Sequence, residues 1–207
     1  MMSRNTGVYT IGIDEAGRGP LAGPVVVAGV KISVNGNARV AKLLNGIRDS
    51  KKLSPKKREE WFSFLTSHPK IEWAVARVWP AMIDRINIAR AADLGATRVY
   101  ANLCSKLSLE QRLAERPVLL DAGLRLPSGV PQRAIIRGDE KIPAIAAASI
   151  IAKVTRDRLM LRLHKKYPQY RFDLHKGYGT RMHREIIGKI GYSEIHRASF
   201  RVKLAAA

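Results

Sequence analysis

Residues 10–30 read TIGIDEAGRGPLAGPVVVAGV, and this stretch decides how the rest of the sequence is interpreted. An apolar run, Ile11–Ile13, leads directly into two adjacent acids, Asp14 and Glu15. A glycine- and proline-rich turn follows, and then a second apolar run that ends at Val30. The pattern predicts strands over 8–13 and 24–32 that form a hairpin. The two acids need a separate explanation, because charged side chains rarely belong to a core.

The composition indicates a folded protein with an anionic partner. The chain has 207 residues, of which 46% are apolar, and this suits one domain or a domain with an appendage. Its net charge is +20, from 37 Lys and Arg against 17 Asp and Glu. Such an excess favours nucleic acid as the partner over a merely solubilising surface or anionic lipid. The single cysteine, Cys104, excludes an internal disulfide and a cysteine-rich metal site.

The sequence carries no targeting signal that we recognise. Its first residues lack the long apolar stretch of a secretory signal, and no window reaches the roughly 18 uncharged apolar residues that a membrane span needs. We therefore expect a cytoplasmic protein without a membrane partner, and we expect it to be a monomer.

Further along the chain, helical and extended patterns alternate. They predict an α/β fold with a mixed sheet. The expected elements after the hairpin are a helix capped by Ser54 and begun by Pro55, a strand over 71–78, one helix from about Pro80 to 104, short buried strands over 118–120 and 134–136, a long helix over 143–166, and a loop with a short helix in the basic tail from 167.

Carboxylates follow three of the predicted strands. These acids are Asp14 with Glu15, Asp121, and Asp139. A single acid in such a place is usually a turn residue or a helix cap. If adjacent strands carry them, however, the carboxylates converge and repel one another unless a cation neutralises them.

Converging carboxylates point to metal chemistry. Mg²⁺ prefers oxygen ligands, and a pair of such ions can stabilise the attacking and leaving oxygens of a phosphodiester displacement. A basic protein with an acidic, metal-binding centre has the layout of a nuclease. The alternative is a basic nucleic-acid-binding protein without catalysis, but it leaves the acids at the strand ends unexplained.

Five segments together resemble the successive motifs of the bacterial ribonuclease HII family. They are GIDEAGRGPLAGPVVVAGV (12–30), RDSKKLS (48–54), LLDAGL (119–124), RGDEKIPAIAAASIIAKVTRDR (137–158) and HKGYGT (175–180). The related ribonuclease HIII type usually carries an extra N-terminal domain, and because the acidic pair begins at residue 14 we expect none here.

The resemblance implies a fold and an activity. The fold is RNase H-like, with a mixed central β-sheet flanked by helices, and we expect a catalytic domain over 1–165 and a small helical substrate-binding extension over 166–207. The implied enzyme is an endoribonuclease that cleaves the RNA strand of RNA–DNA hybrids. It also nicks DNA duplexes 5′ of embedded ribonucleotides by two-metal-ion hydrolysis, leaving 5′-phosphate and 3′-hydroxyl ends, in ribonucleotide removal, replication and repair.

The resemblance also assigns the acids, with Mg²⁺ or Mn²⁺ as the cofactor and two ions at the site when substrate is bound. Asp14, Glu15 and Asp121 match metal ligands, and Asp139 matches the fourth catalytic acid. This chain has Arg137 where the family usually has Lys before the Gly.

Two further acids compete with Asp139 for that role. Glu140 is adjacent to it in the sequence, and Asp157 lies on the long helix. For Asp157 we prefer an ion pair with Lys153, Arg156 or Arg158.

Two glycine-containing motifs are candidates for reading the ribose. By resemblance, Gly17, Arg18 and Gly19 contact the 2′-hydroxyl, the group that distinguishes RNA from DNA. The alternative for them is a simple hairpin turn. By resemblance, Tyr178 packs on the deoxyribose that follows the ribonucleotide, and its alternative is partly buried packing.

Four other residues are candidates for phosphate binding. Ser50 and Lys51 lie in a basic segment that leads into a helix. The alternative interpretation of this segment is a solvated run of charges. Ser149 and Lys153 share one helix face with Asp157. The alternative interpretation of this face is an ordinary amphipathic helix without a phosphate site. The histidines at 164, 175, 183 and 196 lack metal-ligand spacing, so we expect surface or packing roles for them.

Overall fold

A mixed five-stranded sheet forms the centre of the protein, whose computed structural model describes residues 9–33, 42–47, 50, 52–105, 107 and 117–200. The strand order is β3-β2-β1-β4-β5. The strands β1, β2 and β3 pair antiparallel, whereas β4 pairs parallel with β1 and with β5. The bounds are β1 Tyr9–Ala16, β2 Val25–Ser33, β3 Ile71–Val78, β4 Val118–Asp121 and β5 Gln132–Ile135.

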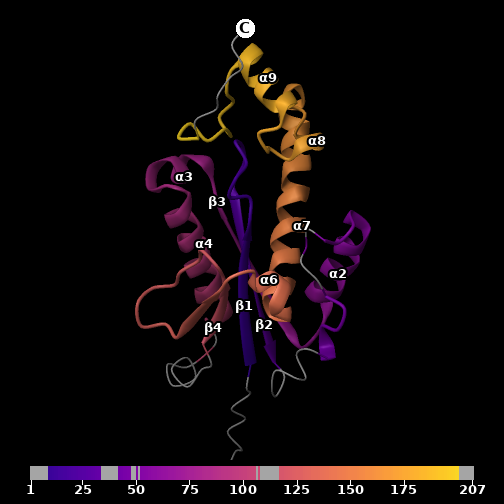
Figure 1. Ribbon diagram of the computed structural model, residues 1–207, viewed down its shortest axis with the longest axis vertical. Helices are drawn as coiled ribbons and strands as arrows, with labels where there is room; N and C mark the ends of the chain where they lie inside the picture. Colours follow the sequence, from indigo (N-terminus) through magenta and orange to yellow (C-terminus); the bar gives the residue numbers. More distant parts are fainter. Residues whose placement is uncertain are drawn as a thin grey trace, which may run out of the picture.

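Helices cover both faces of this sheet (Figure 1). On one face, α4 packs Ala92, Ala96 and Val99 against Ile13 and Val27 of the hairpin. On the other, α7 and α2 pack against the opposite side chains of β2. The helix bounds are α2 Pro55–Ser67, α3 Pro80–Ile86, α4 Ile88–Leu103, α6 Gly138–Lys141, α7 Pro143–Lys166, α8 Phe172–His175 and α9 Arg181–Ile190, with a 3₁₀ turn over Pro168–Tyr170.

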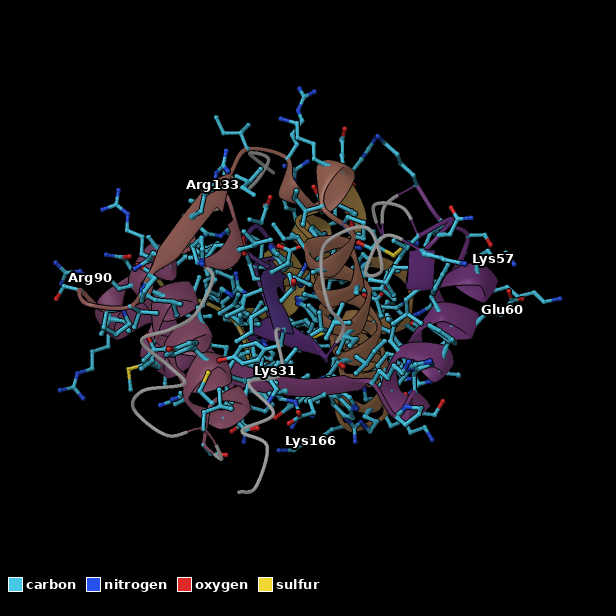
Figure 2. All side chains as sticks on the ribbon, turned by 90° about the horizontal axis from the view of Figure 1, so that it is seen from below. Lys31, Lys57, Glu60, Arg90, Arg133 and Lys166 are labelled. Carbon is cyan, nitrogen blue, oxygen red and sulfur yellow. The ribbon has the colours of Figure 1, made fainter. Side chains whose placement is uncertain are left out.

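Exposed basic side chains project from the outer layers. Figure 2 shows Arg90 on α4 and Arg133 on β5 pointing away from the sheet, and Lys57 beside Glu60 on α2. The Lys57 ammonium lies 2.8 Å from the Glu60 carboxylate. Lys31 is buried instead and pairs with Glu72 at 2.8 Å. None of the helices in the described ranges is both long and apolar enough to pass through a membrane.

Most of the elements predicted from the sequence are confirmed. The hairpin, the strand over 71–78 and the helix over 143–166 are present. Ser54 caps α2 with its hydroxyl, which accepts from the Lys57 amide, and Pro55 is the first helical residue.

Two predicted elements need correction. The single helix from Pro80 is wrong, because Asn87 has φ +66° and interrupts it. The Asn87 side chain accepts from the Arg90 amide and so caps a second helix, α4. The last strand covers 132–135 rather than 134–136, and it is exposed rather than buried because β5 is the sheet edge. Asp139 therefore lies in the short helix α6 and not at the end of a strand.

The segment after α7 packs at the end of the hairpin. Figure 1 shows α8 and α9 at that end of the molecule. Tyr170, Phe172 and Ile195 form an apolar cluster with Ala22 of the hairpin turn and Met160 of α7. The division into 1–165 and 166–207 stays a prediction.

The long helix α7 lies unusually close to β1 at Gly12. A Cβ atom built on Gly12 would lie only 2.4 Å from the Ala144 carbonyl carbon, in the alanine-rich start of α7. We predict that Gly12→Ala lowers the free energy of unfolding by about 3 kcal/mol, because helix backbone must move away from the sheet.

Denaturant titration measures this change. Gly188→Ala is the matched control, because its Cβ would meet nothing within 4 Å and the residue lies inside helix α9. That substitution should add about 0.5–1 kcal/mol. Equal stability of the two variants would contradict the close approach of α7 and β1.

Candidate active site

Neighbouring strands bring the predicted acids together. In the parallel pairing of β1 with β4, Ile13 is the partner of Leu120. Asp14 and Asp121 come next on their strands, so they leave the sheet at the same level. Glu15 follows Asp14, and the two carboxylates and Asp121 interact electrostatically. Stretches more than 100 residues apart in sequence thus contribute to one acidic centre.

Asp14 is the most buried member of this centre, with 4% of its surface exposed. Burial raises the pKa of Asp14 well above its ordinary value, and the charges of Glu15 and Asp121 raise it further. Hydrogen bonds offset part of this effect: the Glu15 amide donates to Asp14 Oδ1 at 2.7 Å, and the Ser149 hydroxyl also contributes. These hydrogen bonds hold the Asp14 carboxylate in place, but they do not fully offset the effects of burial and of the neighbouring charges on its ionised form.

Glu15 is the second carboxylate whose charged form is destabilised by burial. Burial raises its pKa, and the Arg18 guanidinium opposes that rise. Arg18 Nε lies 2.5 Å from Glu15 Oε1. The other oxygen, Oε2, is buried and accepts no hydrogen bond from the described residues.

The donor chemistry of the centre fits a hard divalent cation, since carboxylate oxygens are its preferred ligands and one of them is buried without a partner. Across the described ranges, no three His, Cys, Asp or Glu side chains are grouped so that they could hold one metal ion. Glu15 is turned toward Arg18 instead.

The loop after β5 adds Asp139 to this end of the sheet. The Gly138 amide donates to Asp121 Oδ1 at 2.8 Å, which fixes the start of α6 beside Asp121. Asp139, the next residue, is buried. Of its two competitors, Glu140 is exposed and lies 3.3 Å from Lys52. Asp157 pairs with Lys153 at 2.8 Å, as expected for it.

The loop after β1, residues 17–24, is called the glycine loop here, and it is hydrogen-bonded to two other loops. Arg18 Nη2 donates to the Gly123 carbonyl at 2.6 Å, just after Asp121. The Leu21 amide donates to the Gly177 carbonyl at 2.8 Å, next to Tyr178. The structure thus brings Gly17–Gly19 and the Tyr178 loop together, which sequence separation alone could not indicate.

Tyr178 has 41% of its surface exposed, so its ring is available to a ligand. Lys153 and Arg156 lie 5.8 and 5.6 Å from the ring centroid. Both cations come from α7, and they place the ring beside the helix face that carries Ser149.

Of the four candidates for phosphate binding, the two serines lie inside the protein. Ser50 Oγ and Ser149 Oγ are 2.9 Å apart and both are buried. Because Ser149 also bonds to Asp14, their arrangement favours support of that carboxylate over contact with a phosphate. Lys153 is partly exposed. Lys51 lies outside the described residues.

Sequence reasoning missed two buried arginines, Arg156 and Arg197, which hydrogen-bond to the loop after β1. No periodic pattern identifies such residues, since arginine normally indicates a surface position.

Three histidines have packing roles, as expected. His175 and His183 stack with ring centroids 4.2 Å apart, and the Nε2 atoms of His183 and His196 are 3.1 Å apart. Burial lowers the pKa of His183 and of His196 to about 4, so both rings are neutral near pH 7. His164 is half-buried, and its Nδ1 lies 3.3 Å from the Asp173 carboxylate.

The sheet order, the flanking helices and the acids at the ends of β1 and β4 define an RNase H-like α/β protein. Solved structures agree. The ribonuclease H2 of Pyrococcus horikoshii superposes with a TM-score of 0.69 at 28% identity, covering 93% of this chain and 94% of that one. The ribonuclease HII of Archaeoglobus fulgidus, solved in a complex with PCNA, superposes with a TM-score of 0.68 at 31% identity, covering 95% and 96%.

The family model for ribonuclease HII matches residues 11–203, and the chain belongs to the ribonuclease HII family. The ribonuclease HII of Caldicellulosiruptor bescii is 45% identical over 193 residues, which cover 93% of this chain and 86% of the relative. The protein is thus a hydrolase of the ribonuclease H type, an endonuclease. The alternative of a binding protein without catalysis is wrong.

Proposed function

We propose that this endonuclease cleaves the RNA strand of RNA–DNA hybrids and nicks duplex DNA on the 5′ side of a single embedded ribonucleotide. The products are a 3′-hydroxyl and a 5′-phosphate, and the cellular role is the removal of ribonucleotides during replication and repair. The observation that carries the proposal is the contact between the acidic centre and the glycine loop through the Glu15–Arg18 pair. It couples the residues for hydrolysis to the residues for ribose recognition.

Asp14, Glu15 and Asp121 would hold the divalent cation, Mg²⁺ or Mn²⁺, and two ions would be present once substrate phosphate adds its own oxygens. When bound, such ions activate water and stabilise charge on the leaving oxygen. Repulsion among the buried carboxylates supports this assignment, as does the unsatisfied Glu15 Oε2. Glu15 would leave its ion pair with Arg18 and bind the cation instead. Asp139 would be the fourth acid of the site.

The remaining residues would position the substrate. No backbone carbonyl among the described residues accepts from the amides of Arg18 and Gly19, so these N–H groups are available to a 2′-hydroxyl. The exposed Tyr178 ring would stack on the adjacent deoxyribose. Lys153, the basic segment with Lys51, and exposed basic side chains of the segment after α7 would contact phosphates, in keeping with the net charge of +20.

Three duplexes of one sequence test this proposal: all-DNA, DNA with a single ribonucleotide, and an RNA–DNA hybrid. With Mg²⁺ or Mn²⁺ we expect cutting of the last two only, because the all-DNA duplex lacks the 2′-hydroxyl. Chelation by EDTA should stop cutting, and added cation should restore it. The upstream product should be extended directly by a DNA polymerase, which requires a 3′-hydroxyl. Comparable cutting of the all-DNA duplex would contradict recognition of the ribose.

A further inference from the structure

Two arginine side chains are buried beneath the glycine loop. Arg156 of α7 has 0% of its surface exposed, and Arg197, which follows α9, has 1%. Fully buried arginines are rare unless they are paired with an acid. In the described part of the chain neither of these forms an ion pair.

Arg197 binds backbone carbonyls of the loop after β1. Its Nη2 donates to the Gly17 carbonyl at 2.6 Å, its Nη1 donates to the Arg18 carbonyl at 2.7 Å, and its Nε donates to the Gly23 carbonyl at 3.0 Å. One planar guanidinium thus holds both ends of this loop. With the carbonyls of Gly17 and Arg18 turned inward, the loop can direct amides outward.

Arg156 connects the same loop to the segment before Tyr178. Its Nη2 donates to the Ala22 carbonyl and its Nε to the Pro24 carbonyl, both at 3.1 Å. Its Nη1 donates to the Lys176 carbonyl at 3.0 Å. The guanidinium also lies over the Tyr178 ring.

Backbone hydrogen bonds complete the connection. The Arg197 amide donates to the Leu21 carbonyl and the Gly23 amide donates to the Ile195 carbonyl, both at 2.8 Å. The Leu21–Gly177 bond described above joins the third segment. The glycine loop, the Tyr178 loop and residues 195–197 therefore form one hydrogen-bonded unit.

Burying two positive charges side by side is energetically unfavourable. Burial, together with the neighbouring positive charge of Arg156, lowers the pKa of Arg197 to about 9. Replacing buried charges by well-packed apolar side chains is often neutral or stabilising. Stability therefore does not explain two adjacent buried guanidiniums. The six carbonyl contacts do explain them, since only arginine has a rigid fork of donors.

We propose that Arg156 and Arg197 are positioning residues that fix the glycine loop against the Tyr178 loop and so set the place of the ribose relative to the acidic centre. This inference rests on the proposed recognition of a ribonucleotide by those two loops. Neither arginine needs to touch the substrate, because both act through the backbone that they hold.

The test uses Arg197→Lys and Arg156→Lys in the full chain, with the duplex that carries one ribonucleotide. Lysine keeps the charge but cannot bind three separated carbonyls. We expect the single-turnover rate constant at saturating enzyme to fall about 10- to 100-fold, since a displacement near 1 Å can reduce a rate about a hundredfold. The affinity for the all-DNA duplex, measured with Ca²⁺ in place of Mg²⁺, should stay within about twofold because the surface charge is unchanged.

Ile187→Ala is the matched control for lost stability. Ile187 is buried in α9 and none of the six carbonyl contacts involves it. Unfolded enzyme lowers the amount of active protein but not the rate constant at saturation, so this variant should keep the wild-type rate constant. If Arg197→Lys does not fold, Arg197→Gln replaces it as the second variant beside Arg156→Lys.

The outcomes separate this inference from the proposed function. If wild-type protein fails to cut the duplex with one ribonucleotide, the proposed function is wrong. If wild-type protein cuts it and folded arginine variants keep its rate constant within about twofold, the positioning role is wrong and the proposed function stands. An equal fall of the rate constant in Ile187→Ala would also overturn the positioning role.

Discussion

Asp14→Asn should lower the rate of cleavage by at least about a hundredfold, as expected when a preorganised charge is removed from a reaction centre. It should also raise the melting temperature of the metal-free protein. Asp14 is buried beside Glu15 and Asp121, and its charge is repelled by both. Asparagine keeps an oxygen that can accept from the Glu15 amide, so the local backbone has no reason to change.

The pH dependence follows from the direction of the pKa shift. The pKa of Asp14 is higher in the folded than in the unfolded protein, so its contribution to stability is present at low pH and is lost as the pH rises through the folded pKa. The advantage of Asp14→Asn in the absence of metal should therefore be largest near neutral pH and shrink on acidification. Bound cation should remove it, because the cation stabilises only the wild-type carboxylate.

Single-turnover cleavage and thermal melting with and without Mg²⁺ measure these effects. Glu59→Gln is the matched control: it removes the same charge from an exposed pair with Arg158 on the protein surface. Exposed pairs contribute about 0–1 kcal/mol, so rate and melting temperature should change little. Full activity of Asp14→Asn would eliminate the acidic centre as the site of hydrolysis.

Gly17→Ala should lose both stability and activity. Gly17 has φ +94°, a conformation that alanine adopts only with strain. Its added Cβ would also lie 2.1 Å from Arg156 Nε, on a side chain held by three carbonyls. We expect the free energy of unfolding to fall by about 2–5 kcal/mol from backbone strain and overpacking together. The cleavage rate of the remaining folded enzyme should fall about a hundredfold, because the loop is displaced.

Gly19→Ala separates the two effects. Gly19 is exposed, and its added Cβ would meet nothing within 4 Å. Denaturant titration should give nearly wild-type stability for this variant. A loss of cleavage in Gly19→Ala would then report contact with the substrate rather than with the protein. Wild-type melting of Gly17→Ala would contradict the close packing of Arg156 beneath the loop.

Local patterns were sufficient to predict most of the fold. Apolar runs bounded by turn residues gave the hairpin, and the long run from Pro143 gave α7, because these signals lie within a few residues of each other. The interruption at Asn87 escaped detection since one residue with positive φ leaves the helical spacing unchanged. The exposure of β5 could not be read from its sequence, because it depends on strand order.

Some residues of the candidate site were likewise visible in the sequence, and others were not. Asp14, Glu15 and Asp121 were found because acids directly after apolar runs are visible in the sequence. Five of the six carbonyl contacts that hold Arg156 and Arg197 are with residues 132 to 180 positions away. Composition predicts such residues to be on the surface, so only the structure reveals their burial.

The late position of Arg197 has a consequence for synthesis on the ribosome. The acids of β1 and β4 have been translated by residue 121, whereas the carbonyls of Gly17 and Arg18 must wait for a residue about 180 positions downstream. Contacts so distant in sequence form late in folding. A nascent chain can therefore assemble its sheet well before it organises the loop next to Asp14, which delays maturation of the enzyme until Arg197 has emerged from the ribosome.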